Sequence, residues 1–263
     1  MRSIDRHTPL SMIGRVSLIF DAFQPDEDAL GVREIARRTG LASSTVSRIV
    51  RELVAHRLLE MAGQEVRIGL RFFELGEQAP RPQQLRRLAL ASMSDLRSAT
   101  RHTVHLAVLD GTEVVYVTKL CSRSAPPLGS RVGGRLPAHA TAVGKALLAF
   151  SGSDIVDRVM AAGLRRLGPG TITDPARLRA ELATIRESGI AYETEESGPN
   201  VVCVAAPISN RIAEPIAGLS ISARLGEMDV ASLGLAVRTA AITLGRQAAR
   251  MPSFAGTAWA ELT

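Results

Sequence analysis

A run of short hydroxyl side chains followed by arginines lies in the first quarter of the chain. Its members are Ser43, Ser44, Thr45, Ser47, Arg48 and Arg51. Apolar residues recur between them at helical spacing, from Val46 through Val50 to Val54, so a helix would turn the polar side chains away from its core-facing side. Hydroxyl groups on such a helix can approach base edges closely, and guanidinium groups pair with phosphates. The segment therefore predicts a DNA-binding helix, with Ser43 or Ser44 as its N-cap.

The elements around this segment are expected in the order of a winged helix-turn-helix. They are helices over residues 13–23 and 32–39, the serine-rich helix, and strands over residues 58–61 and 66–68. Gly40 is placed to end the second helix, and Gly63 lies in the turn between the strands. In such a domain the last helix enters the major groove, and Arg67 or Arg71 on the wing is expected to contact the DNA backbone. The alternative is a helical subdomain used only for packing or dimerisation.

Charge gives weaker evidence about where DNA would bind. The formal charge is +6, but residues 1–78 hold 11 arginines and 11 acidic residues. Within them, residues 33–71 hold eight arginines and four glutamates. This local excess is an electrostatic footprint of the kind that attracts DNA, and solvated helix faces carry similar charge.

The remainder of the chain alternates between strand and helix patterns. Residues 78–84 contain Pro80 and Pro82 and indicate a linker, followed by an amphipathic helix to about Thr100. The other predicted elements are helices over residues 141–150, 153–162, 175–188 and 228–250, and strands over residues 104–110, 113–120, 201–208 and 215–223. Residues 101–250 therefore predict an α+β domain with an antiparallel sheet and flanking helices.

The one phosphate-loop-like segment is incomplete. His139 stands where the first glycine of the motif belongs, and Ala146 replaces the hydroxyl residue after Lys145. Lys145 is therefore expected on a helix surface or at an interface. Three nearby glutamates in a later segment are expected to form a partly solvated charge run: Glu193, Glu195 and Glu196.

The cysteines and histidines do not form a metal-binding pattern. Cys121 and Cys203 are far apart without zinc-ligand spacing, so both are expected to be reduced thiols. His102 and His105, three apart on a strand, would point to opposite faces, and no signature supports a dyad of Cys203 with His139. We therefore expect no catalytic residue, no metal and no cofactor. The longest apolar run has eight residues, too few to span a bilayer, so a cytoplasmic protein without membrane partners is expected.

Several longer blocks, all in one order, resemble the IclR-type bacterial transcriptional regulators. The first is GVREIARRTGLASSTVSRIVRELVAHRLLE, residues 31–60. Later blocks are TVHLAVLDGTEVVYVTKL, VGGRLPAHATAVGKALLAF, VVCVAAPI and IAGLSISA. The resemblance implies a winged helix-turn-helix joined by a helix to a GAF-like effector domain, a dimer or tetramer, and regulation of an operon by a small metabolite, often a carboxylic acid.

The resemblance also places six residues around the effector: Thr141, Ala142, Glu193, Cys203, Ser220 and Ser222. The residues themselves agree in part. Thr141 would open a helix whose free N–H groups and positive dipole end favour a carboxylate. Ser220 and Ser222 are two apart on a strand, so their hydroxyls share one face. Departures from the family pattern are Ser43 in place of a basic residue, Pro199 and Asn200 after Gly198, and Glu193 in place of an aspartate.

The predicted organisation is a DNA-binding domain (1–78), a linker helix (79–100), a GAF-like effector domain (101–250) and a C-terminal tail (251–263). The predicted function is a transcriptional regulator whose affinity for double-stranded operator DNA is changed by a small carboxylic acid. The alternative is a metabolite-binding enzyme or sensor whose N-terminal helices serve only in assembly.

Overall fold

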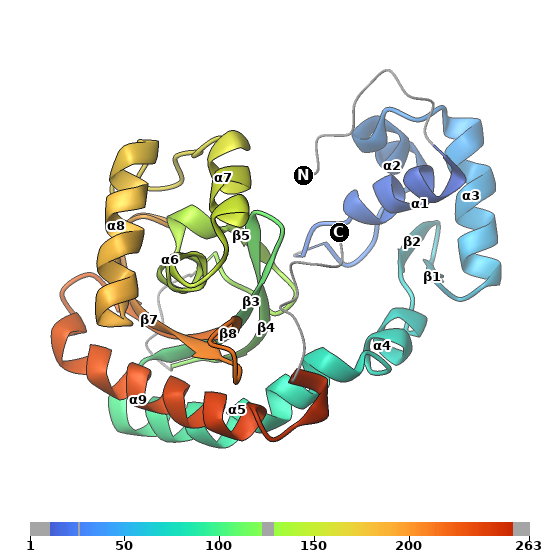
Figure 1. The fold of residues 1–263 in the computed structure, drawn as a ribbon. Coiled ribbons are helices and arrows are strands. Elements are labelled where there is room, and N and C mark those ends of the chain that lie inside the picture. The colour runs from blue at the N-terminus through green and yellow to red at the C-terminus, as the bar shows by residue number, and fades with distance from the viewer. Residues whose placement is uncertain (1–10, 26, 123–128, 255–263) are drawn as a thin grey trace. The chain divides into compact units, whose positions relative to one another are not determined.

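The computed structural model describes residues 11–25, 27–122 and 129–254, and it divides the chain into two compact units, Met1–Pro80 and Arg81–Thr263 (Figure 1). Each unit has its own hydrophobic core. Of the predicted C-terminal tail, residues 255–263 lie outside the described part.

The described part of the first unit has the order of a winged helix-turn-helix. Its elements are α1 (Met12–Asp21), α2 (Val32–Thr39), α3 (Ser43–Ala55), β1 (Leu59–Ala62), β2 (Glu65–Ile68) and α4 (Arg71–Gly76). The first three helices meet in one core, where Ile19, Ile35 and Val46 are fully buried. Gly40 ends α2 with a φ of 69°, a conformation that favours glycine. The predicted order of elements is confirmed.

The N-cap of α3 is not a serine. Ala42 holds the N-cap position, and no side chain caps the helix. Ser43 and Ser44 are already the first two residues of the helix, and both are exposed. The prediction that one of them caps α3 is therefore wrong.

The second unit is a six-stranded antiparallel sheet with helices on both faces (Figure 1). The strands are β3 (Thr103–Asp110), β4 (Glu113–Leu120), β5 (Arg135–Pro137), β6 (Ala191–Thr194), β7 (Val201–Ser209) and β8 (Pro215–Arg224), in the sheet order β5-β4-β3-β8-β7-β6. The helices are α5 (Pro80–Thr100), α6 (Ala142–Ala149), α7 (Ser153–Ala161), α8 (Pro175–Ser188) and α9 (Val230–Ala248). α6, α7 and α8 lie on one face of the sheet, and α5 and α9 cover the other. The predicted α+β fold is confirmed, and none of the described helices is long and apolar enough to cross a membrane.

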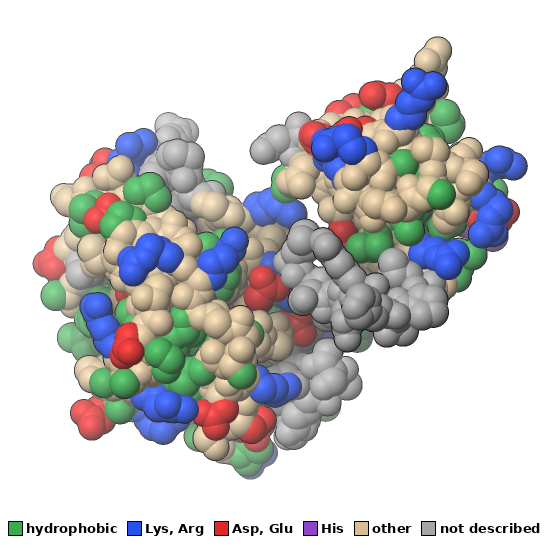
Figure 2. Space-filling view, turned by 90° about the horizontal axis from the view of Figure 1, so that it is seen from above, with side chains coloured by type: hydrophobic (Ala, Val, Ile, Leu, Met, Phe, Trp, Pro, Cys, Tyr) green, Lys and Arg blue, Asp and Glu red, His purple; other side chains and the backbone are tan. Residues whose placement is uncertain are grey.

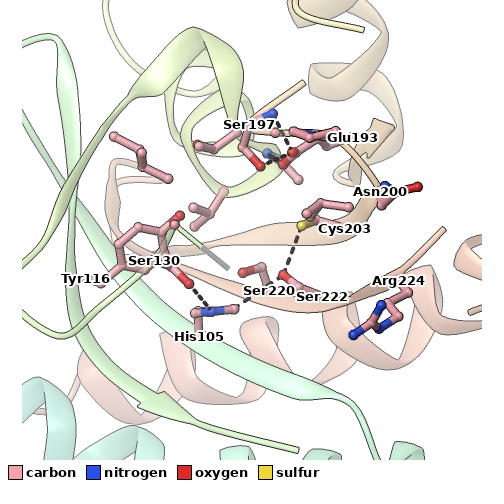
Figure 3. A pocket seen from close by; sticks show the side chains of 18 residues that line it. His105, Tyr116, Ser130, Glu193, Ser197, Asn200, Cys203, Ser220, Ser222 and Arg224 are labelled. Carbon is pink, nitrogen blue, oxygen red and sulfur yellow. Dashed lines mark hydrogen bonds between the residues drawn. The ribbon is translucent and has the colours of Figure 1, made fainter. Parts of the chain in front are cut away.

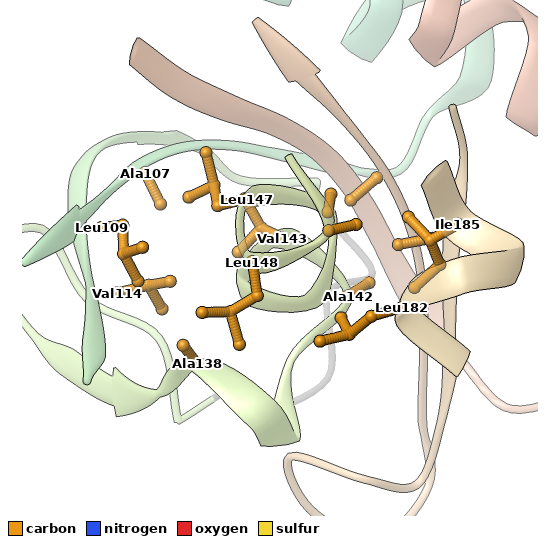
Figure 4. Close-up of a cluster of buried hydrophobic side chains, with 14 of the residues drawn as sticks. Ala107, Leu109, Val114, Ala138, Ala142, Val143, Leu147, Leu148, Leu182 and Ile185 are labelled. Carbon is orange, nitrogen blue, oxygen red and sulfur yellow. The ribbon is translucent and has the colours of Figure 1, made fainter. Parts of the chain in front are cut away.

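α6 packs closely on the sheet and on the turn that precedes it because a glycine lies at each of these contacts. A Cβ on Gly218 of β8 would lie 2.4 Å from Cγ2 of Val143, and one on Gly144 would lie 2.1 Å from the carbonyl oxygen of Ala138. Leu147 and the side chains around it fill the remaining space (Figure 4). This packing fixes the N-terminal end of α6 beside the sheet.

The segment expected to be a proline-containing linker is the start of a helix. α5 begins at Pro80, and prolines are tolerated in a first turn because the N–H groups there lack intrahelical acceptors. Leu85, Ala89 and Met93 of α5 are fully buried in the core on the α9 side of the sheet. α5 is therefore a packed part of the second unit, and the prediction of a linker over residues 78–84 is wrong from Pro80 onward.

Three short elements are not predicted from the sequence. α4, β5 and β6 have six, three and four residues, too few to show a period. β5 and β6 are also the edge strands, and each forms where its neighbour, β4 or β7, offers a free row of backbone groups.

Candidate ligand cavity and candidate DNA-binding helix

A cavity of about 380 Å³ opens beside the N-terminal end of α6. Its walls come from all six strands of the sheet, from the N-terminal end of α6, and from the loops that carry Ser130 and Ser197 (Figure 3). The six residues that the family resemblance places around an effector all line it: Thr141, Ala142, Glu193, Cys203, Ser220 and Ser222. Its volume suits a small metabolite.

Glu193 is bound to the protein's own donors inside this cavity. Its Oε2 accepts a hydrogen bond from the Ala142 N–H at 3.0 Å, and its Oε1 accepts one from the Ser197 N–H at 2.7 Å and another from the Ser197 hydroxyl. Only 2% of Glu193 is exposed, so the prediction of a solvated side chain is wrong. The Thr141 hydroxyl accepts from the Gly144 N–H at 2.9 Å. The N-terminus of α6, expected to be open for an effector carboxylate, is therefore already occupied by the carboxylate of Glu193.

A chain of uncharged groups lines another wall. His105 Nε2 lies 2.9 Å from Ser130 Oγ, His105 Nδ1 lies 3.4 Å from Ser222 Oγ, and that oxygen lies 2.9 Å from Cys203 Sγ. Burial, with a smaller contribution from the charge of Lys119, lowers the pKa of His105 to about 3. Burial also raises the pKa of the Cys203 thiol. At neutral pH this wall therefore offers hydrogen bonds without charge.

These groups do not form a catalytic site. His139 Nε2 donates to the carbonyl oxygen of Arg165 at 3.1 Å, whereas Cys203 is hydrogen-bonded with Ser222. A protonated, buried thiol is a poor nucleophile. Within residues 11–25, 27–122 and 129–254, no group of three or more His, Cys, Asp or Glu side chains is placed to hold a metal ion. The cavity has the features of a binding site.

Two side chains leave polar groups available to a ligand. Ser220 is 3% exposed and makes no side-chain hydrogen bond with any other described residue. Arg224 follows Ser222 by two positions on β8, is exposed, and is the one Lys or Arg among the described residues that line the cavity. The cavity therefore has an uncharged buried end at Ser220 and a cationic edge at Arg224.

Lys145 is fully buried, although the sequence predicts a surface or interface position for it. Its Nζ lies 2.6 Å from Glu196 Oε1 and 3.0 Å from Oε1 of Glu181 on α8. The prediction is wrong because α6 is covered on all sides, and every residue of this helix is buried. The Thr171 hydroxyl also donates to the Glu196 carbonyl oxygen at 2.6 Å. These bonds tie the loop that carries Ser197, and with it one wall of the cavity, to α6 and α8.

The ionisation of the Glu196 carboxyl group depends on its pairing with Lys145. Burial raises the pKa of its carboxyl to about 7, against the opposing effect of Lys145. Its Oε2 has no hydrogen-bond partner in the described structure. Glu196 is 6% exposed, so the predicted solvated charge run is wrong for it as well, while Glu195 is half-buried.

The predicted DNA-binding side of α3 faces solvent. Ser43, Ser44, Ser47, Arg48 and Arg51 are exposed, and Thr45 is partly so. Arg48 and Arg51 form no ion pair with a described carboxylate, so both guanidinium groups are available to phosphates. On the opposite side Val46, Ile49 and Leu53 are buried, which fixes the face that the helix presents.

The two arginines expected on the wing occupy different elements. Arg67 lies on β2, with its Nε 3.4 Å from Glu60 Oε2 on β1. Arg71 is the first residue of α4, and its Nη1 lies 2.7 Å from Glu74 Oε2. Arg71 therefore lies beyond the wing, and its predicted place there is wrong because a short helix follows β2 directly.

Part of the positive excess of residues 33–71 is neutralised within the first unit. Arg38 hydrogen-bonds with both Glu27 and Glu34, and Arg37 also binds Glu34. The hydrogen bonds from Arg37 and Arg38 lower the pKa of Glu34 to about 2. Figure 2 shows basic and acidic side chains interspersed on the visible face of the second unit too. The net charge of residues 33–71 therefore overstates the positive electrostatic potential that DNA would meet.

Six further polar residues line the cavity and were not predicted. They are His105, Tyr116, Ser130, Ser197, Asn200 and Arg224. Arg224 could have been predicted from the sequence, because it follows Ser220 and Ser222 at the same two-residue spacing and alternate residues of a strand share one face. Ser130, Ser197 and Asn200 come from loops, where no period exists to read.

Two family models match the chain, a shorter one near its N-terminus and a longer one over most of the remainder. Residues 78–246 match "Bacterial transcriptional regulator IclR C-terminal", and residues 13–62 match "IclR helix-turn-helix domain". The chain is 31% identical over 227 residues to the HTH-type transcriptional regulator XynR of Escherichia coli (strain K12), covering 85% of this chain and 90% of that protein.

Solved structures give the same result for the fold. An IclR homolog from Microbacterium hydrocarbonoxydans, complexed with 4-hydroxybenzoate, matches with a TM-score of 0.83 and 34% identity, over 90% of this chain and 100% of that chain. The Thermotoga maritima IclR structure matches with a TM-score of 0.73 and 26% identity, over 89% of this chain and 97% of that chain.

Proposed function

This chain belongs to the IclR family of bacterial transcriptional regulators, and on that premise we propose which of its residues bind DNA and which bind the effector. The protein is a DNA-binding regulator with an effector-binding C-terminal domain and is not an enzyme. We also propose that it acts in the cytoplasm, where its DNA lies, and that residues 1–78, 79–100 and 101–250 serve as DNA-binding domain, linker helix and effector domain.

The proposed effector is a small monocarboxylate with an apolar or aromatic body. The Microbacterium homolog was solved with 4-hydroxybenzoate, a molecule of this class. In the present chain Glu193 already occupies the N-terminus of α6, and a second carboxylate beside it would be repelled. The effector carboxylate is therefore assigned to the side of Arg224, and the hydroxyls of Ser220 and Ser222 bind polar groups deeper in the cavity. The observation that carries this assignment is that the cavity holds one filled anion position, at Glu193, and one guanidinium, that of Arg224, which forms no ion pair with a described carboxylate.

The proposed DNA contacts come from α3, the hairpin of β1 and β2, and the first residue of α4. Base and phosphate contacts are assigned to Ser43, Ser44, Thr45, Ser47, Arg48 and Arg51, and backbone contacts to Arg67 and Arg71. The exposure of the α3 side chains and the burial of the opposite side of the helix support this assignment. Two copies would read two half-sites about one DNA turn apart.

A homodimer or homotetramer is proposed because the first unit exposes apolar side chains. Leu70 is 64% and Phe73 65% exposed, and Leu75 adds to the same short segment around α4. Exposed apolar residues clustered in this way favour association. Sedimentation equilibrium of the full chain measures the oligomeric state.

Replacing Arg48 by alanine is expected to weaken operator binding and to flatten its salt dependence. Each phosphate neutralised on duplex DNA contributes about −0.9 to the slope of log K against log salt, so a dimer that loses one contact per subunit loses about two units of slope. The measurement is fluorescence anisotropy with the intergenic DNA upstream of the chain's own gene, at several salt concentrations.

The matched control is Arg179→Ala. Arg179 is an exposed arginine of α8 whose Nη2 lies 2.8 Å from Asp157 Oδ1 in the second unit. Its removal should leave the slope unchanged. An Arg48→Ala protein that binds the DNA with the wild-type slope and affinity would refute the proposed role of α3.

A further inference from the structure

A second cavity, of about 450 Å³, lies among α8, α9 and the end of β7. Four arginines line it: Arg186, Arg211, Arg238 and Arg246. Glu187 is the single carboxylate side chain among its described lining residues. This arginine cavity shares no described lining residue with the cavity beside α6.

The arginines of this cavity lack carboxylate partners. Some arginines of the second unit are paired, such as Arg135 with Asp110, Arg158 with Asp154 and Arg179 with Asp157. Others, such as Arg224, form no ion pair with a described carboxylate. In the described structure no ion pair involves any of the four cavity arginines, and each of them is exposed. Like charges brought together without counter-charge repel one another, and the repulsion is relieved when an anion binds.

Two of the four lie at the ends of helices. The Arg186 Nε donates to the carbonyl oxygen of Ala149, the last residue of α6, at 2.5 Å. Arg238 lies over Gly189, the C-cap of α8, where its Nε is 3.1 Å from the position a Cβ would take. The hydrogen bond therefore holds the Arg186 guanidinium at the cavity wall before any ligand arrives.

The charge of the cavity suits an anion. The C-cap residues of α6, α8 and α9 all line it: Phe150, Gly189 and Ala249. Each helix C-terminus carries roughly half a negative charge, so the three ends together offset about one and a half of the four guanidinium charges. Glu187 offsets one more, and about one and a half positive charges remain.

We propose that the arginine cavity is a second anion-binding site, which takes a phosphorylated small metabolite. Guanidinium groups bind phosphate oxygens through paired N–H donors, and a phosphate monoester carries close to two negative charges at neutral pH. The volume holds a molecule of the size of a sugar phosphate. The site is separate from the proposed effector cavity and gives the regulator a second small-molecule input.

Calorimetric titration of the full chain with pyrophosphate, at an ionic strength held constant with sodium chloride, tests this site. We expect saturable binding to the wild-type protein, weakened at least tenfold by Arg211→Gln with Arg246→Gln, because both substitutions remove charge-assisted hydrogen bonds to the anion. The side chains of these two arginines make no hydrogen bond or ion pair with described residues, so the double variant should fold normally. The control variant is Arg158→Gln with Arg179→Gln, which should bind pyrophosphate as the wild type does.

Three results would overturn the proposal. They are no saturable binding to the wild type, equal binding by the wild type and the Arg211/Arg246 variant, and equal weakening by the control variant. Citrate titrated in parallel distinguishes the class of anion, and tighter binding of citrate than of pyrophosphate would reject the phosphate assignment. Ser220→Ala with Ser222→Ala should leave pyrophosphate binding unchanged, which separates this site from the effector cavity.

Discussion

Replacing Lys145 by methionine is expected to lower the free energy of unfolding of the second unit by about 3–5 kcal/mol. Methionine keeps most of the volume but removes the charge that pairs with Glu196 at 2.6 Å. Because Glu196 is almost completely buried, its carboxylate would be left without a counter-charge. At roughly 2–4 °C per kcal/mol for units of this size, the melting temperature should fall by about 6–20 °C. Differential scanning calorimetry measures both quantities.

Lys145→Met with Glu196→Gln is the control, because the glutamine removes the unpaired charge. Most of the lost stability should return in this double variant.

The effect of pH on the stability of the second unit has a definite sign. The pKa of Glu196 is raised from 4.5 to about 7 in the folded protein, so its ionisation opposes folding, and the penalty grows as pH rises through this window.

Without Lys145 the pKa of Glu196 rises further, since the attraction that opposes burial is gone. The stability deficit of Lys145→Met should therefore be small near pH 5 and larger near pH 8. A deficit that does not change with pH, or that persists in the double variant, would show that lost packing and not the unpaired carboxylate is responsible.

Removing the two hydroxyls of β8 is expected to weaken effector binding. A hydrogen bond between uncharged groups contributes about 0.5–1.5 kcal/mol, so Ser220→Ala with Ser222→Ala should weaken binding roughly 5- to 150-fold. The measurement is a thermal-shift titration with 4-hydroxybenzoate and related benzoates, since a ligand that binds the folded state raises the melting temperature by mass action.

Ser153→Ala provides the matched control, because Ser153 is an exposed serine at the start of α7. This variant should respond to the ligand as the wild type does. The melting temperature without ligand must stay close to that of the wild type in both variants, since Ser222 also hydrogen-bonds with Cys203. An unchanged response in the Ser220/Ser222 variant would exclude this wall of the cavity as the binding surface.

Local patterns were sufficient to predict most of the fold. The α8 helix follows its signals closely: Asp174 accepts from the Arg177 N–H, Pro175 opens the helix, and Gly189 ends it with a φ of 71°. The hairpin of β3 and β4 likewise forms around Gly111. These features depend on residues close in sequence, which is why periodicity and turn chemistry identify them.

Burial of charged side chains could not be predicted in the same way. Lys145 and Glu196 are 51 residues apart, and only the packing of α6 between the sheet and α8 brings them together. The same holds for Glu193 and Ala142, also 51 residues apart. A single sequence shows each of these residues as an ordinary polar position, because the partner that permits its burial comes from another element.

A ligand in the cavity beside α6 is expected to change the affinity of the protein for operator DNA. Linkage makes this effect reciprocal, so the DNA must change the affinity for the ligand by the same factor. The direct measurement is calorimetric titration of the most stabilising benzoate into the free protein and into its complex with the upstream intergenic DNA. We expect the two dissociation constants to differ by about 5- to 150-fold. Equal dissociation constants, with the ligand bound in both titrations, would contradict the account.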